Sequence, residues 1–202
     1  MGIITISRVY GCGARDMART LAQRLKYTLF EKEIVPMLAR RLDRKAEYTI
    51  EHDELHDMLS SSVIDFASSR FAFLKKDAIT PQEYSAALRD IFLHLAKEGN
   101  VILIGRGSQF ILKDHPGVCH IRLVASIEDR LEYLRSNRFI TLAEDTLIQR
   151  IKAEDHRRRE FLQTHFHNDG EDPLLYHLTI NLSKIPRDTA MEMIIRLIGE
   201  GA

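Results

Sequence analysis

Short apolar runs alternate along the chain with segments in which apolar residues recur at helical spacing. Three runs have the length and composition of buried β-strands: Ile3–Ile6, Val101–Ile104 and Cys119–Ala125. Two shorter segments, Thr28–Phe30 and Tyr176–Asn181, continue the alternation. Mostly apolar strands separated by helices are typical of a parallel sheet covered on both faces. We therefore expect an α/β fold with a five-stranded parallel sheet and Ile3–Ile6 at or near its centre.

Helical patterns fill the spaces between these strands. Apolar residues at every fourth position over residues 17–25 form one buried stripe. A further helix is expected to begin at Thr80, because Pro81 suits the first helical position and Glu83 completes a capping box. Residues 32–100 are mostly helical in pattern, so we expect a helical insertion within a single domain of residues 1–202.

The overall charge excludes some classes of function. Lys+Arg and Asp+Glu both number 29, which gives a formal net charge of zero. A general nucleic-acid binder normally has a basic excess, so no nucleic-acid partner is expected. Two cysteines make no disulfide framework, and no apolar run approaches the roughly 18 residues of a membrane span. We expect a cytoplasmic protein with no membrane association.

A glycine-containing turn after the first strand carries the clearest functional signal. Gly11 and Gly13 separate Ile3–Ile6 from a helix, and such turns let backbone N–H groups approach a phosphate. Against the phosphate-binding pattern GxxxxGKS/T, Arg8 stands at the first glycine and Ala14 at the lysine. The expected phosphate-binding segment contains Arg8, Gly11, Cys12, Gly13, Ala14, Arg15 and Asp16.

The missing lysine leaves two candidates for the positive charge. Arg8 and Arg15 both stand beside the glycines, and either can contact phosphate in bidentate fashion. Arg15 can equally be a solvated residue of the first helical turn. Asp16 is the candidate Mg²⁺ ligand, although an acid at this place also stabilises a helix N-terminus.

An ordered set of segments resembles the cytidylate kinase-like family, relatives of the P-loop nucleoside monophosphate kinases. The set comprises Ile4–Arg8 with the two glycines, Phe30–Ile34, Ile104–Gly107, Asp155-x-x-Arg158 and Asp172-Pro173-x-x-Tyr176. The resemblance implies a P-loop NTPase-like three-layer sandwich with a helical insertion. It also implies an arginine-bearing lid over about residues 137–170.

The same resemblance implies roles for individual residues. Arg106 matches an arginine that contacts the acceptor phosphate, and Glu31 and Asp155 fall on the acceptor side. Arg130 and Arg158 are the implied catalytic arginines, and Arg15 joins them as a candidate catalytic residue because it can supply the charge of the missing lysine. Gly107 stands where the family has aspartate, so recognition of a cytidine-like base is open. For Arg158 the alternative is a solvated helix face paired with nearby glutamates.

Two classes of function follow. The first is an ATP- and Mg²⁺-dependent phosphotransferase acting on a nucleoside monophosphate or a similar small acceptor. The second is a non-catalytic nucleotide- or anion-binding protein with a degenerate P-loop. Nucleotides are the expected partners in either case, and a homo-oligomer is compatible with the sequence.

Overall fold

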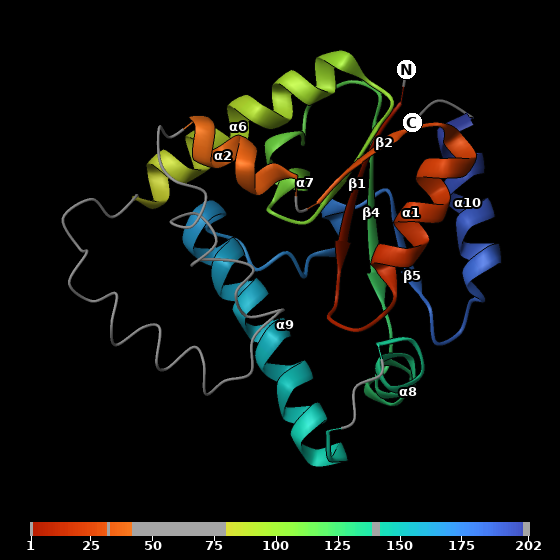
Figure 1. Cartoon of the computed structure of the whole chain (residues 1–202). Coiled ribbons are helices and arrows are strands. Elements are labelled where there is room, and N and C mark those ends of the chain that lie inside the picture. Colours follow the sequence, from red (N-terminus) through yellow and green to blue (C-terminus); the bar gives the residue numbers. More distant parts are fainter. Residues whose placement is uncertain (1, 32, 42–79, 139–141, 200–202) are drawn as a thin grey trace. The chain divides into compact units, whose positions relative to one another are not determined.

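The computed structural model describes residues 2–31, 33–41, 80–138 and 142–199 (Figure 1). Residues 42–79 of the predicted helical insertion lie outside these residues. The chain divides into two compact units, Met1–Glu31 with Phe92–Ala202, and Lys32–Ile91. Apart from the predicted insertion, every residue assigned a role from the sequence lies in the first unit.

A five-stranded parallel sheet forms the centre of the first unit, with the order β2-β3-β1-β4-β5. The strands are β1 (Ile3–Arg8), β2 (Thr28–Phe30), β3 (Val101–Ile104), β4 (Val118–Val124) and β5 (Leu178–Asn181). The predicted parallel sheet and the central place of β1 are both confirmed. Because β1, β3 and β4 lie side by side, the loops that follow them meet at one edge of the sheet.

Helices make up most of the described residues outside the sheet. They are α1 (Ala14–Leu25), α2 (Ile34–Arg41), α6 (Pro81–Glu98), α7 (Ser108–Ile111), α8 (Ile127–Arg138), α9 (Glu144–Phe166) and α10 (Arg187–Gly199), with a 3₁₀ turn at Pro173–Leu175. In the described ranges, none of these helices has the length and apolar character that crossing a membrane requires.

The start of α6 can be compared with the sequence prediction. At α6 the capping box forms, with the Thr80 backbone N–H donating to Glu83 Oε2 at 2.9 Å and the Glu83 N–H donating to Thr80 Oγ1 at 3.2 Å. The sequence also places Glu144 in the capping-box position after Thr141, but Thr141 lies outside the described residues. Among the described residues, α9 begins at Glu144, and its N-cap, Ala143, has no side-chain hydrogen bond.

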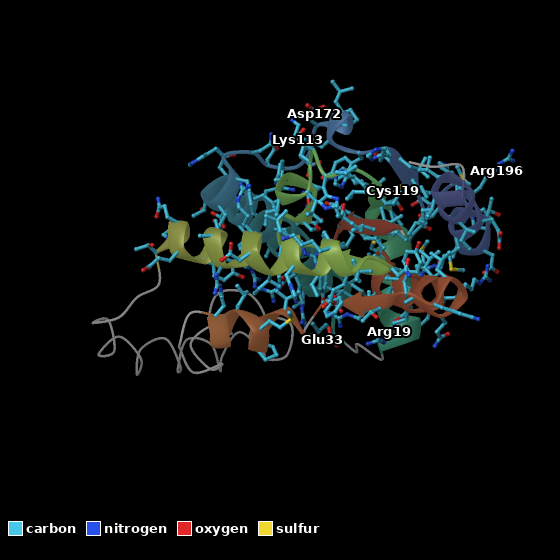
Figure 2. The ribbon with its side chains drawn as sticks, turned by 90° about the horizontal axis from the view of Figure 1, so that it is seen from above. Arg19, Glu33, Lys113, Cys119, Asp172 and Arg196 are labelled. Carbon is cyan, nitrogen blue, oxygen red and sulfur yellow. The ribbon has the colours of Figure 1, made fainter. Side chains whose placement is uncertain are left out.

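One face of the sheet is apolar and is covered by α1 and α10, which pack against each other (Figure 1). Ile4 and Ile6 of β1 point to this face and are fully buried. Met17 and Leu21 of α1 meet them there, as the fourth-residue spacing predicts. Figure 2 shows Cys119 inside this layer and Arg19 and Arg196 at the outer surface.

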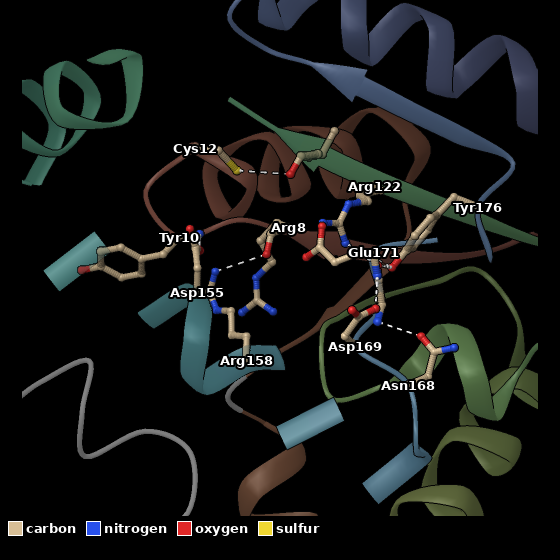
Figure 3. Close-up of polar contacts among 12 residues, drawn as sticks. Arg8, Tyr10, Cys12, Arg122, Asp155, Arg158, Asn168, Asp169, Glu171 and Tyr176 are labelled. Atoms are coloured by element: carbon tan, nitrogen blue, oxygen red, sulfur yellow. Dashed lines mark hydrogen bonds and ion pairs between the residues drawn. The ribbon is translucent and has the colours of Figure 1, made fainter. Parts of the chain in front are cut away.

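The opposite face of the sheet contains buried polar side chains. Thr5 and His120 lie opposite each other on β1 and β4, and Thr5 Oγ1 is 2.7 Å from His120 Nδ1. Arg122 lies further along β4, where it forms an ion pair with Glu171 at 2.6 Å and donates to the Gly170 carbonyl at 2.5 Å (Figure 3). Burial opposes the charge on Arg122, but hydrogen bonds to Glu171 and Tyr176 raise its pKa overall. The residues after α9 are thereby tied to the sheet.

The buried histidine makes stability depend on pH. Burial, and to a smaller extent the nearby His177, lowers the pKa of His120 from 6.5 to about 4. The folded protein therefore keeps the imidazole neutral between about pH 6.5 and pH 4, where a free histidine would take up a proton. Unfolded chains bind the proton more readily, so the free energy of unfolding falls as the pH drops below 6.5. Between pH 7.5 and 5 this loss is about 2 kcal/mol.

We expect His120→Gln to remove that part of the pH dependence. Urea unfolding of the wild type and the variant at pH 7.5 and pH 5 measures it. Parallel pH dependence in the two proteins would contradict the assignment.

Candidate phosphate-binding site

The loop between β1 and α1 has the backbone form of an anion site. Gly11 and Gly13 have φ angles of 78° and 79°, which side chains disfavour. A Cβ at Gly11 would also lie 2.8 Å from Leu134 Cδ1. Within the described chain, no hydrogen bond is donated by the backbone N–H groups of Gly11, Cys12 or Gly13. The loop therefore presents donors at the N-terminus of α1, where the helix dipole also favours an anion.

Arg130 and Asp155 hold this loop at Tyr10. The Tyr10 N–H donates to Asp155 Oδ1 at 2.7 Å, and Arg130 Nη1 donates to the Tyr10 carbonyl at 3.2 Å. Arg130 also pairs with Asp155 Oδ2 at 2.5 Å, and its side chain is 8 % exposed. Two predicted site residues, one from α8 and one from α9, are thus brought together as a clamp on the loop. Their catalytic and acceptor-side roles stay predictions.

Arg8 and Arg15 share a single carboxylate, that of Glu31 after β2. Arg15 Nε donates to Glu31 Oε2 at 2.6 Å, and Arg8 Nη2 lies 3.7 Å from Glu31 Oε1. Burial, with the nearby charge of Arg158, lowers the pKa of Arg8 to about 10, so the group stays charged at neutral pH. The structure joins the two candidate lysine replacements to a predicted acceptor-side residue, which neutralises part of their charge.

Arg158 of α9 lies beside Arg8, the last residue of β1 (Figure 3). Its Nη1 donates to the Arg8 carbonyl at 3.3 Å, and its Cζ lies 5.5 Å from the centre of the Tyr10 ring. It has no carboxylate partner among the described residues. A partly buried guanidinium without a counter-ion beside free backbone donors suits an anionic ligand.

Arg106 stands in an unusual backbone turn after β3. Its φ is 56°, between Gly105 and Gly107 at 70° each, so three successive residues are left-handed. Such a conformation is costly at a residue with a side chain and is found mainly at functional sites. The Arg8 guanidinium lies against Gly105, which places the turn beside the phosphate loop. The Phe166 ring lies against Gly107, where the family has aspartate.

Asp16 is already engaged by protein partners. It accepts a hydrogen bond from the Tyr133 hydroxyl and lies 3.6 Å from Arg19 Nη1. In the pattern GxxxxGKS/T the hydroxyl position is Arg15, so no hydroxyl stands at that place. Mg²⁺ is usually bound by one or two protein carboxylates together with phosphate oxygens, so Asp16 alone could serve as its protein ligand.

Sequence reasoning missed Arg187, at the start of α10. Its Cζ lies 4.4 Å from the centre of the Tyr133 ring, and its guanidinium packs on Gly13. A Cβ placed on Gly13 would be 2.6 Å from that Cζ. One feature of the sequence could have pointed to Arg187: it stands at the start of a helix, where a cation opposes the helix dipole and so needs a compensating partner or ligand.

The five-stranded parallel sheet and the glycine-containing loop after β1 define an α/β protein with a candidate phosphate-binding loop. The model of the cytidylate kinase-like family matches residues 3–184. The chain therefore belongs to the cytidylate kinase-like family, as its motifs predicted. None of the curated proteins matches it.

Solved structures share this fold at low sequence identity. An uncharacterised protein from Eubacterium ventriosum ATCC 27560 is similar with a TM-score of 0.71 and 19% identity, covering 98% of this chain and 99% of that one. Gluconokinase from Sinorhizobium meliloti 1021 has a TM-score of 0.54 and 15% identity over 98% and 94% of the two chains. Shikimate kinase from Bacteroides thetaiotaomicron has 0.53 and 11% over 98% of each. Family membership, with this shared fold, supports a nucleotide-dependent small-molecule kinase.

Proposed function

We propose that this protein transfers the γ-phosphate of ATP to a nucleoside monophosphate or a similar small acceptor. The observation that carries the proposal is the β1–α1 loop, in which three backbone N–H groups lack an acceptor within the described chain and arginines stand on several sides. We expect nucleotides, rather than nucleic acid or a membrane, to be its partners, and the cytoplasm to be its location.

The proposed reaction needs positioning and neutralisation of charge rather than a covalent intermediate. An oxygen of the ionised acceptor phosphate bonds to the γ-phosphorus, the bond from that phosphorus to the β–γ bridging oxygen breaks, and ADP leaves with the bridging oxygen. The loop amides hold the phosphates, while Arg158 stabilises the charge that develops on the transferred group. Mg²⁺, when bound with ATP, would neutralise further phosphate charge, with Asp16 as its protein ligand.

The acceptor side would be built from Arg106 and Glu31. Arg106 would contact the acceptor phosphate, and Glu31 would hold Arg8 and Arg15 at the boundary between the two substrates. The site is not a copy of the family pattern, because Phe166 covers Gly107. An aromatic ring in place of a carboxylate changes the recognition of the acceptor's base or sugar.

We expect Arg106→Gly to raise the KM for the acceptor at least tenfold and to leave the KM for ATP within about twofold. Glycine suits the observed φ of 56°, so the variant removes the side chain without adding backbone strain. Steady-state kinetics with each substrate varied in turn measures both constants. An unchanged acceptor KM would place Arg106 outside the site.

One observation favours the non-catalytic alternative. The chain lacks the lysine, and Glu31 already neutralises part of Arg8 and Arg15. A thermal-shift series with ATP, ADP and the nucleoside monophosphates, with and without Mg²⁺, tests binding first. A phosphotransfer assay on the nucleotides that bind then separates the two functions. Binding of ATP without turnover of any acceptor would favour the alternative.

A further inference from the structure

We infer that Arg187 supplies the positive charge that the phosphate loop lacks at its lysine position, and that it contacts the polyphosphate chain at Gly13. The identification of that chain as part of ATP rests on the proposed function. The anion contact itself rests on the geometry of the loop.

The first support is the place of the guanidinium. Arg187 arrives from the N-terminus of α10 and packs on Gly13, the N-cap residue of α1. A Cβ on Gly13 would lie 2.6 Å from Arg187 Cζ and 2.8 Å from Nη2. Gly13 immediately precedes Ala14, where the pattern GxxxxGKS/T has lysine. A cation from a distant helix thus lies beside the position that lacks one.

The second support is the absence of a counter-ion for Arg187 in the part of the chain that the structure describes. The adjacent Asp188 points to Arg24 instead, at 3.7 Å, and Arg24 also pairs with Glu192 at 2.7 Å. Arg8 and Arg15, by contrast, both meet Glu31. Arg187 therefore keeps more of its charge available than the two arginines that flank the glycines in sequence.

The third support is convergence on the middle of the loop. Burial raises the pKa of the Cys12 thiol, but Arg158, Arg8 and Arg187 all act on it in the opposite direction through their charges. The positive charges of guanidinium groups from β1, α9 and α10 therefore act on the same loop residue. Such a cluster repels itself, and an anion bound to the loop amides would relieve that repulsion.

Tyr133 positions Arg187. The guanidinium lies over the Tyr133 ring at 4.4 Å, in the geometry of a cation–π contact, while the Tyr133 hydroxyl donates to Asp16. The chain Asp16–Tyr133–Arg187 links the first turn of α1 to the start of α10. It offsets the unfavourable placement of a cation at a helix N-terminus.

The test compares Arg187→Ala and Arg187→Lys with Arg196→Ala in the full chain. Arg196 is exposed in the last turn of the same helix and serves as the matched control. Calorimetry with inorganic tripolyphosphate and with ATP measures binding, and the unfolding midpoint without ligand shows that each variant is folded. We expect Arg187→Ala to weaken both ligands about 10- to 100-fold, Arg187→Lys to restore part of the loss, and Arg196→Ala to stay within about twofold.

Two outcomes separate this inference from the proposed function. If tripolyphosphate binding depends on Arg187 but no acceptor is phosphorylated, the inference stands and the kinase function fails. Equal tripolyphosphate affinity in the wild type and a folded Arg187→Ala variant overturns the inference, even if the protein is an active kinase. A wild-type protein that binds neither tripolyphosphate nor ATP also overturns it.

Discussion

Gly13→Val is expected to abolish binding of inorganic phosphate and ATP while the protein remains folded. Gly13 has a φ of 79°, which a β-branched residue adopts only with strain. A Cβ there would also displace the Arg187 guanidinium from the loop. The substitution therefore removes the backbone shape and an adjacent cation together. Calorimetric titration with phosphate and ATP measures the loss.

Gly117→Val is the matched control for that variant. Gly117 has a φ of 74° and precedes β4, at the opposite edge of the sheet from the phosphate loop. Both substitutions cost about 1–2 kcal/mol of stability through backbone strain. Only the change at Gly13 should affect anion binding. Normal phosphate affinity in Gly13→Val, or equal losses in both variants, would argue against the loop as the site.

Arg158→Ala is expected to lower the rate of phosphotransfer about 30- to 1000-fold, which corresponds to roughly 2–4 kcal/mol of charge-assisted interaction. Arg158 has no carboxylate partner among the described residues, so its removal leaves no buried carboxylate unpaired. Stability should therefore change by less than about 0.5 kcal/mol.

Arg159→Ala provides the comparison for Arg158. Arg159 is the next residue of α9 and is exposed, so the substitution removes an equal charge from the same helix. Its rate should stay within about twofold of the wild type, since screened surface charges contribute little. Equal effects of the two variants would show that Arg158 acts only through the general charge of α9.

The sheet was predictable because its strands differ from their surroundings in a simple way. Val101–Ile104 is a continuous apolar run and Ile3–Ile6 is interrupted only by Thr5, which is typical of strands buried on both faces. The short helix α7, by contrast, has four residues, too few to show a helical period. In β4, His120 and Arg122 interrupt an otherwise apolar run of the sequence. In the structure both lie on the buried polar face of the sheet, where His120 contacts Thr5 and Arg122 pairs with Glu171.

The candidate site was predictable where its signal is local. Gly11 and Gly13 mark the loop because only glycine readily takes their backbone angles. The use of each charged residue could not be predicted, because it depends on contacts across the chain. Glu31 meets two arginines, Asp155 holds the backbone of Tyr10, and Arg187 reaches Gly13 from the last helix. No spacing within the sequence encodes these pairings.

The most direct test of the account is phosphotransfer by the full chain with ATP, Mg²⁺ and each common nucleoside monophosphate in turn. Chromatography of the nucleotides after incubation measures both the ADP and the phosphorylated acceptor. The account predicts that ADP forms only when a suitable acceptor is present, in equal amount to the new product, and that Arg158→Ala suppresses both. Binding of ATP with no acceptor turned over, or no nucleotide binding at millimolar concentration, would contradict it.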